Sequence, residues 1–173
     1  MIKLRDAQFS DYAAIAKLHT ESWRKTYRGI YSDSFLDHEV EQERLHVWQH
    51  KLKSPNNNQQ VIIATLEDTV AGFACLYLNN DPVFGSLLDN LHVSTTLQKS
   101  GIGKLLMIEC AKYISNKSNS NKMYLWVFEV NKNARDFYER LGGISFETIT
   151  KQNNDGTYSQ SCRYVWDDVS KIM

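Results

Sequence analysis

The chain has 173 residues, which is room for one domain with a substantial core, and we expect residues 1–173 to form a single domain. Hydrophobic residues make up 42% and charged residues 23%, which is ordinary for a soluble globular protein. Lysine plus arginine and aspartate plus glutamate number 20 each, so the formal net charge is zero, and neither nucleic acid nor an anionic membrane is favoured as a partner.

The cellular location is indicated by two further features. The N-terminus has no long apolar region after its positive charges, and no stretch approaches the roughly 20 apolar residues that span a bilayer. The three cysteines, Cys75, Cys110 and Cys162, are widely spaced within apolar patterns, which favours buried reduced thiols over a disulfide or a metal site. We therefore expect a cytoplasmic protein with no membrane contact and no bound metal.

Apolar periodicity and turn residues divide the chain into strands and helices, without internal repeats. In the first half we expect, in order, a strand at 2–5, a helix from 11 to about 27 capped by Ser10, a helix at about 34–52, and a hairpin of strands 61–66 and 70–78. The first helix would carry Ala14, Ile15 and Leu18 on one face. Residues 79–82, Asn-Asn-Asp-Pro, then predict a turn.

The second half of the chain continues the alternation. We expect, in order, a strand at 87–93, a helix from 101 to about 115, a polar loop at 116–121, a strand at 123–128, a helix at about 132–141, and a hairpin of strands 144–151 and 158–166. Strands outnumber helices and the two kinds are interspersed, which indicates a mixed α/β or α+β fold.

Glycines stand at alternate positions before the third helix, in the pattern Gln98-x-x-Gly101-x-Gly103. Glycine lets the backbone approach a ligand closely, and the first turn of a helix presents free N–H groups and the positive end of a dipole. These donors suit a phosphate or pyrophosphate. The same two glycines also fit an ordinary tight turn.

Two other glycine-rich motifs fit this segment less well. A P-loop requires Ser or Thr after Gly103-Lys104, where Leu105 stands, and an earlier glycine, where Gln98 stands. The glycine turn of a helix-hairpin-helix module requires a helix before it, whereas residues 87–93 predict a strand. The neutral charge also offers no face for tracking nucleic-acid phosphates.

A second motif follows the strand at 123–128, with the spacing Asn-x-x-Ala-x-x-Phe-Tyr-x-x-x-Gly. Its members are Asn131, Ala134, Phe137, Tyr138 and Gly142. Together with the glycine loop, it resembles the GNAT superfamily, the GCN5-related N-acetyltransferases, whose cofactor loop has the form Gln/Arg-x-x-Gly-x-Gly/Ala. The motifs cover about residues 87–143, and the order of predicted elements agrees with the family along the whole chain. The family usually has an aromatic residue after the last glycine, where this chain has Gly143.

The resemblance implies a splayed mixed β-sheet of about six or seven strands flanked by about four helices, split between residues 87–93 and 123–128. It implies acetyl-CoA as co-substrate, with the pyrophosphate on backbone N–H groups of residues 99–104. The pantetheine arm would pair with the open strand at 91–93, and the Val93 N–H would polarise the thioester carbonyl. Asn131 would bond the cofactor arm, and it also fits a helix-cap role. The implied cofactor-binding residues are Leu91, His92, Val93, Gln98, Lys99, Ser100, Gly101, Ile102, Gly103, Lys104, Asn131, Ala134 and Tyr138.

Tyr138 is the strongest candidate for a catalytic residue. When an amine attacks the thioester, the departing sulfur needs a proton or a hydrogen bond, which a phenol with a pKa of about 10 can supply. Helical spacing places Ala134 and Tyr138 on the same face, so Tyr138 can project towards the split. The alternative is a core aromatic residue packed beside Phe137.

The acceptor amine must lose a proton before it attacks, because an amine with a pKa near 10.4 is almost wholly protonated at neutral pH. Many family members place a glutamate six residues before the valine of this strand, where this chain has Leu87. The nearest substitutes are Asp89 and His92, which lie on opposite faces of a regular strand, although a bulge could bring both towards the cleft. We favour Asp89 as the base, since His92 is equally well explained as a structural histidine.

Four aromatic residues cluster in the first two helices and the link between them: Trp23, Tyr27, Tyr31 and Trp48. In the family this region walls the acceptor site, so aromatic rings here could bind an amine by cation–π contact. Core packing explains at least two of the four, and we expect Tyr27 and Tyr31 to be the exposed, substrate-binding pair. The acceptor itself stays open among polyamines, amino acids, aminoglycosides, small drugs and protein N-termini.

The resemblance therefore predicts an N-acetyltransferase that moves an acetyl group from acetyl-CoA to a small-molecule or protein amine by direct attack in a ternary complex, with Tyr138 as general acid. The alternative is a domain of the same fold that binds acyl-CoA as a sensor or scaffold without turning it over. The missing glutamate favours that alternative and the retained tyrosine opposes it. Acyl-chain preference and oligomeric state stay open, with a homodimer as one option.

Overall fold

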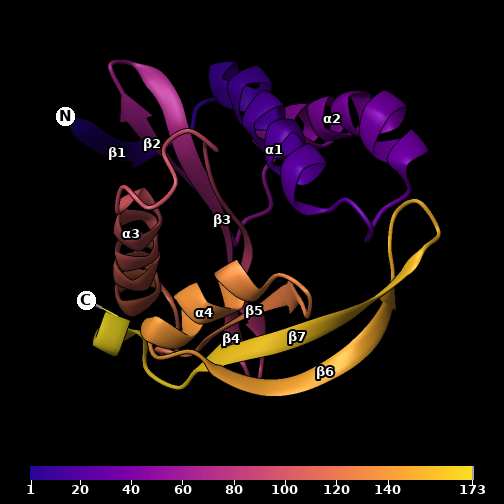
Figure 1. Cartoon of the computed structure of the whole chain (residues 1–173). Coiled ribbons are helices and arrows are strands. Elements are labelled where there is room, and N and C mark those ends of the chain that lie inside the picture. The colour runs from indigo at the N-terminus through magenta and orange to yellow at the C-terminus, as the bar shows by residue number, and fades with distance from the viewer. Residues whose placement is uncertain (173) are drawn as a thin grey trace.

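A sheet of seven strands forms the centre of the protein, in the order β1-β2-β3-β4-β5-β7-β6 (Figure 1). The computed structural model describes residues 1–172. The strands are β1 (Ile2–Asp6), β2 (Gln59–Leu66), β3 (Thr69–Asp81), β4 (Gly85–Val93), β5 (Met123–Phe128), β6 (Ile144–Gln152) and β7 (Tyr158–Trp166). The α-helices are α1 (Tyr12–Thr26), α2 (Val40–Lys53), α3 (Ile102–Lys117) and α4 (Lys132–Arg140), with short helical turns at Phe9–Asp11, Phe35–Glu39 and Val169–Ile172. The predicted mixed α/β fold is confirmed.

The sheet changes character between β4 and β5, which run parallel, whereas the other neighbouring strands are antiparallel. The two strands pair only at Ser86 with Met123 and Leu87 with Tyr124, near the start of each strand. Beyond these pairs, the edge of β4 that faces β5 has no strand beside it. The predicted split is confirmed, and it leaves polar backbone groups of β4 available to a ligand.

The helices cover both faces of the sheet (Figure 1). α1 and α2 pack over one face in a cluster that contains Ile63 and Phe73, whereas α3 packs over the other face in a cluster that contains Ile62 and Leu106. Neighbouring residues of β2 thus enter different clusters, as strand alternation requires. Burial on both sides explains why β2 and the middle of β3 are nearly continuous apolar runs.

The start of α1 differs from the prediction in two respects. Ser10 does not cap the helix, because a turn at Phe9–Asp11 precedes it and the Asp11 carboxylate accepts the Gln8 N–H at 2.7 Å. Ala14 is exposed, while Ala16 is buried at 2% exposure. α1 contacts both the sheet and α2, so its buried face is wider than predicted and includes Ala16 rather than Ala14.

The turn predicted at residues 79–82 is also displaced, because β3 continues through Asp81. Asn79 adopts a left-handed backbone with φ of 50° inside an irregular stretch of the β3–β4 pairing. Its side-chain oxygen accepts from the Ser118 hydroxyl at 2.7 Å and the Asn119 N–H at 2.9 Å. The chain then reverses at residues 82–84, where the Asp81 carboxylate accepts the N–H groups of both Val83 and Phe84.

Burial of the thiols follows the prediction. Cys75, Cys110 and Cys162 are all buried and unbridged. None of the helices within residues 1–172 has the length and apolar character needed to cross a membrane.

Candidate active site

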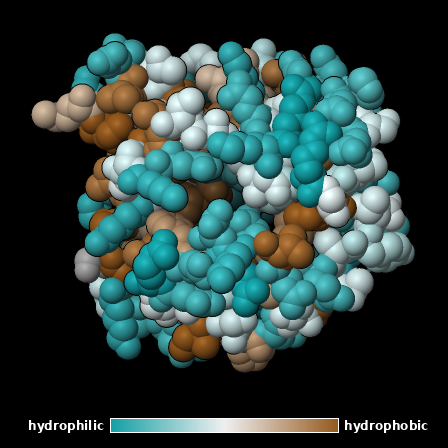
Figure 2. All heavy atoms as spheres, in the orientation of Figure 1, coloured by the Kyte–Doolittle hydropathy of each residue, from teal (hydrophilic) through white to brown (hydrophobic). Residues whose placement is uncertain are grey.

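A cleft of about 1050 Å³ opens where β4 and β5 separate. Figure 2 shows a hollow in the middle of this face, with apolar residues in its depth and hydrophilic residues around it. We call the part lined by residues 98–104, the open edge of β4 and α4 the loop half. The part lined by the end of α1, residues 27–31 and the tip of the β6–β7 hairpin is the hairpin half.

Residues 98–104, the end of the β4–α3 connection and the first turn of α3, are called loop 98–104. They include two residues in the left-handed backbone region, Lys99 with φ of 66° and Gly101 with φ of 90°. The first backbone hydrogen bond of the helix runs from Leu105 N to Gly101 O at 3.0 Å. Within residues 1–172, the N–H groups of residues 102–104 therefore have no backbone acceptor. Lys99 and Lys104 are exposed beside these donors and line the cleft with them. Such a combination suits an anion.

Three other residues of this loop occupy different places. Gln98 is exposed and lines the cleft. The Ser100 hydroxyl instead donates to Leu97 O at 2.6 Å, and the Ile102 side chain is buried in the core at 1% exposure. Ser100 and Ile102, both expected to bind the cofactor, are not among the residues that line the cleft.

The two sequence motifs meet where α3 and α4 begin to pack together. A Cβ atom on Gly103 would lie 3.3 Å from Phe137 Cζ and 3.8 Å from a methyl group of Val93. Gly103 therefore allows the start of α3, the end of β4 and α4 to approach closely. This contact explains why a glycine stands at position 103 without any appeal to backbone strain.

The backbone of β4 has a definite orientation at its end. Ser94 N donates to Ala71 O on β3 at 2.8 Å. Because successive residues of a strand direct their N–H and C=O groups to opposite sides, those of Val93 and Leu91 face away from β3 and towards the split. Leu91, His92 and Val93 all line the cleft.

α4 contributes the residues of the second motif. The Asn131 side chain accepts the Ala134 N–H at 3.3 Å, so Asn131 caps the helix, and both residues line the cleft. Tyr138 also lines the cleft, although it is only 9% exposed, and its ring lies 6.1 Å from that of Trp166. Burial, with a smaller contribution from nearby Tyr27, raises the pKa of Tyr138 and keeps the phenol neutral.

A bulge in β4 changes the facing of the candidate bases. Cys75 pairs with Asn90 and Leu76 with Leu88, so Asp89 is the extra residue. Asp89 Oδ2 lies 2.7 Å from Lys51 Nζ on α2, and His92 Nδ1 lies 2.8 Å from Ser22 Oγ on α1. Both side chains therefore face the α1–α2 side, which a regular strand would not allow.

His92 belongs to a network that reaches into the core. Its ring lies 4.4 Å from that of His19, whose Nδ1 accepts from Trp48 Nε1 at 2.9 Å. Burial, together with Arg44, lowers the pKa of His92 to about 3. Burial also lowers the pKa of His19 well below its usual range. Both imidazoles are therefore neutral at neutral pH.

The aromatic residues of the hairpin half differ from the prediction in exposure. Trp23 and Trp48 are buried, as core packing requires, but Tyr31 is also buried, with 7% exposure. Its ring stacks between those of Trp23 and Phe35 at 4.9 and 5.5 Å, which explains the burial. Tyr27 is half-buried, and both tyrosines line the cleft. The expectation of an exposed pair is wrong for Tyr31.

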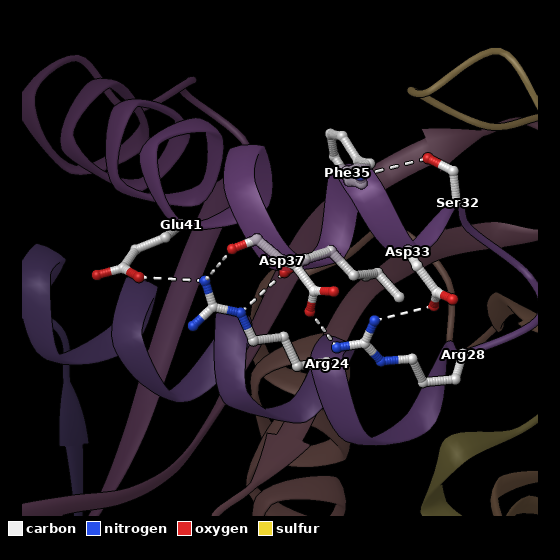
Figure 3. Close-up of polar contacts among 8 residues, drawn as sticks. Arg24, Arg28, Ser32, Asp33, Phe35, Asp37 and Glu41 are labelled. Carbon is white, nitrogen blue, oxygen red and sulfur yellow. Dashed lines mark hydrogen bonds and ion pairs between the residues drawn. The ribbon is translucent and has the colours of Figure 1, made fainter.

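The loop between α1 and α2 is fixed at both of its ends. Arg24 Nε donates to Leu36 O at 2.8 Å, and Arg28 pairs with Asp33 at 2.9 Å and also with Asp37 (Figure 3). These contacts tie the turn at Phe35–Glu39 to the last turns of α1. The loop that carries Tyr27 and Tyr31 is thereby held beside the cleft.

The β6–β7 hairpin closes the far side of the cleft. Ser32 N donates to Asp155 Oδ2 at 2.6 Å, and the Thr157 hydroxyl donates to Ile30 O at 3.1 Å. These hydrogen bonds join segments more than 120 residues apart in the sequence. They place Lys151 and Asn153 in the wall of the cleft.

Sequence reasoning missed several residues that line the cleft on this side: Ser22, Trp126, Lys151 and Asn153. It also missed Lys51, the partner of Asp89, although Lys51 stands three residues after Trp48 on the same predicted helix. The residues of the cleft wall carried no signal, since they come together here only through long-range contacts.

Comparisons with known proteins agree with the two motifs. The profile of the family described as "Acetyltransferase (GNAT) family" matches residues 14–143. An uncharacterized N-acetyltransferase of Bacillus subtilis, YuaI, is 25% identical over 99% of this chain and 96% of its own. A spermidine N(1)-acetyltransferase of Thermoplasma acidophilum is 24% identical over 82% of this chain and 87% of its own. Among solved structures, the PaiA N-acetyltransferase of Thermoplasma acidophilum in complex with coenzyme A superposes with a TM-score of 0.68, at 21% identity, covering 93% of this chain and 98% of that one.

Proposed function

Because the chain belongs to the acetyltransferase (GNAT) family, we propose that it transfers the acetyl group of acetyl-CoA to an amine by direct attack within a ternary complex. The enzyme class and acetyl-CoA as donor follow from family membership. The order of binding, the acceptor and the roles of individual residues form the proposal.

The loop half would bind the donor. The unpaired N–H groups of residues 102–104, with Lys99 and Lys104 beside them, suit the pyrophosphate. The backbone groups of Leu91 and Val93 that face the split suit the amides of pantetheine, which would extend β4 like an added strand. On this placement the Val93 N–H would polarise the thioester carbonyl.

Tyr138 would protonate or hydrogen-bond the leaving sulfur. The attacking nitrogen forms a bond to the carbonyl carbon, the carbon–sulfur bond breaks, and the thiolate of CoA receives the phenol proton. Burial keeps the Tyr138 phenol protonated, and the ring is held by the core while it lines the cleft. That combination favours a general acid over a purely structural aromatic residue.

Asp89 would accept the proton of the incoming amine, directly or through a water molecule. It lines the cleft and forms an ion pair with Lys51 at 2.7 Å. His92 is the alternative, but an imidazole with a pKa of about 3 is no stronger a base than a carboxylate. Its hydrogen bond to Ser22 fits a structural role equally well.

Tyr27 and Tyr31 would form part of the acceptor site, since both line the hairpin half. We propose a small-molecule or peptide amine as the acceptor and the cytoplasm as the location of the enzyme. We further propose that residues 1–173 act as one domain. A homodimer is compatible with this function but is not required by it.

The observation that carries the proposal is that Gly103 and Lys104, whose N–H groups are unpaired, the open edge of β4 and Tyr138 all line one cleft. Release of CoA from acetyl-CoA, measured over a panel of polyamines, amino acids and peptides, tests it. Amine-dependent release with an acetylated product is the expected result. Tight binding of CoA by calorimetry without release for any amine would favour the sensor alternative.

A further inference from the structure

A lysine without a carboxylate partner lies in the hairpin half. Lys151 Nζ sits 3.4 Å from the ring centroid of Trp126, and both residues line the cleft. Glu147, on the same strand, pairs instead with Arg163 at 2.7 Å. Among the ion pairs of residues 1–172, none involves Lys151.

The acidic residues near the hairpin half already have partners. Asp89 pairs with Lys51 at 2.7 Å, and Glu43 pairs with Arg44. Asp155 accepts from the N–H groups of Ser32 and Thr157, which ties it to the hairpin–loop contact. Apart from the Asp89–Lys51 pair, the charge that this half offers to an incoming molecule is therefore the positive charge of Lys151.

The position of Lys151 is fixed rather than free. Trp126 holds the ammonium by a cation–π contact, and Arg163 approaches the same ring at 4.6 Å. The side chain is half-buried, so its ammonium has lost part of its hydration. An anion beside it would restore that stabilisation, whereas a second cation would be repelled.

We propose that the acceptor carries a carboxylate as well as its amine, and that Lys151 binds this carboxylate. The inference rests on the proposed function and narrows it: the acceptor is an amino acid or a compound of that type rather than a polyamine. Lys151 is then a specificity-determining residue of the acceptor site. It contacts the group that does not react.

The charge of Lys151 also gives the proposal a pH signature. Burial and the neighbouring Arg163 lower the pKa of Lys151 to about 8, against a smaller opposing effect of Glu147. The ammonium is charged below that pH and neutral above it. The KM for a carboxylate-bearing acceptor should therefore rise above about pH 8, while the KM of a matched diamine should not.

Lysine and cadaverine form a matched pair for the test, because they differ only by the carboxylate. We expect the wild-type enzyme to favour lysine over cadaverine in kcat/KM by about tenfold. Lys151→Met should abolish the preference and Lys151→Glu should reverse it. Lys53→Met removes a charge from an exposed lysine outside the cleft and should leave the ratio unchanged. A wild-type preference for cadaverine, or equal ratios in wild type and both Lys151 variants, would overturn the proposal.

Calorimetry of the two amines with the CoA-bound protein separates this inference from the proposed reaction. Tighter binding of lysine that is lost in Lys151→Met supports the carboxylate site even if no amine is acetylated. In that event the proposed reaction fails and the anion site stands. If both amines are acetylated but bind with equal affinity to wild type and to Lys151→Met, the proposed reaction stands and the carboxylate site is wrong.

Discussion

The loop half and the hairpin half of the cleft are built in different ways. The loop half uses mainly backbone groups, and its parts come from the stretch between β4 and α4, where two short motifs fix the geometry. The hairpin half uses side chains from α1, the loop after it, β5 and the β6–β7 hairpin, and hydrogen bonds between residues more than 120 positions apart join the loop to the hairpin. Backbone donors are present whatever the side chains, so the loop half suits a ligand that does not vary, such as the acetyl donor. Side chains can be replaced by mutation, so the hairpin half can adapt to different acceptors.

The largest effect is expected at Tyr138, where the two halves meet. Tyr138→Phe keeps the ring packing but removes the phenol proton, and general acid catalysis is typically worth 10²- to 10⁴-fold, so kcat should fall by about that factor. The KM for acetyl-CoA should change little, because the change affects mainly the transition state. Steady-state kinetics with acetyl-CoA and a good acceptor provide the measurement.

Tyr164→Phe is the matched control for this prediction. Tyr164 packs 6.2 Å from Tyr138, but its hydroxyl bonds Glu139 and Arg135 and it does not line the cleft. Its loss should lower stability and leave kcat near the wild-type value. A kcat for Tyr138→Phe within about threefold of wild type, with chemistry rate-limiting, would remove Tyr138 from the mechanism.

The next largest effect on activity is expected at Asp89, in the bulge of β4. Asp89→Asn should lower kcat/KM at neutral pH by about 10²-fold, and high pH should partly restore activity because free amine is then available. Asp89→Asn also leaves Lys51 without its partner, which destabilises the fold. The double variant Asp89→Asn, Lys51→Gln removes the unpaired lysine and should recover stability. It should stay as inactive as Asp89→Asn alone.

His92→Gln separates the two candidate bases. If Asp89 is the base, His92→Gln should keep most of the activity. An active Asp89→Asn together with an inactive His92→Gln would transfer the role to His92. Little loss in either variant would point to a water chain held by backbone groups.

Two glycines allow the halves to be perturbed separately. Gly101 and Gly29 both have positive φ, 90° and 79°, and a Cβ atom on either would meet nothing within 4 Å. Valine at either position should therefore lower the free energy of unfolding by roughly 1–2 kcal/mol through backbone strain alone. Gly101→Val should also weaken acetyl-CoA binding about tenfold, because the donors of the loop must shift.

Gly29→Val should instead raise the KM of the acceptor while acetyl-CoA affinity stays unchanged. Calorimetry with CoA and acceptor kinetics distinguish the two results. If Gly101→Val binds CoA with wild-type affinity, the donor site does not lie at loop 98–104.

A separate effect concerns stability in mild acid and not activity. His19 and His92 are neutral in the fold, with pKa values below the usual 6.5, so the unfolded chain binds more protons as the pH drops. Stability should be nearly constant between about pH 6.5 and 7.5 and fall towards pH 4, by at most about 1.4 kcal/mol per pH unit for each imidazole. Urea unfolding between pH 7.5 and 4.5 measures the slope, and His92→Gln should reduce it. An unchanged slope would mean that His92 is not held neutral by the fold.

The order of elements and the loop half could largely be predicted from the sequence. The strands at Met123–Phe128 and Tyr158–Trp166 end where turn residues and apolar patterns predicted. Gly101 and the spacing from Asn131 to Tyr138 fix local backbone and helix-face geometry, so their consequences follow from neighbours in the chain. The individual roles of these residues in catalysis stay predictions.

Only the tertiary structure decided how the hairpin half is formed. The bulge at Asp89 has no local signature, yet it turns Asp89 and His92 to the same side. Lys151 and Trp126 gave no signal, because their meeting depends on the β5–β7–β6 pairing and on the hairpin tip reaching the α1–α2 loop. Local backbone preferences act over a few residues and can be predicted from the sequence. The hydrogen bonds that join the hairpin tip to the α1–α2 loop connect residues more than 120 positions apart, and contacts of that range leave no local pattern in the sequence.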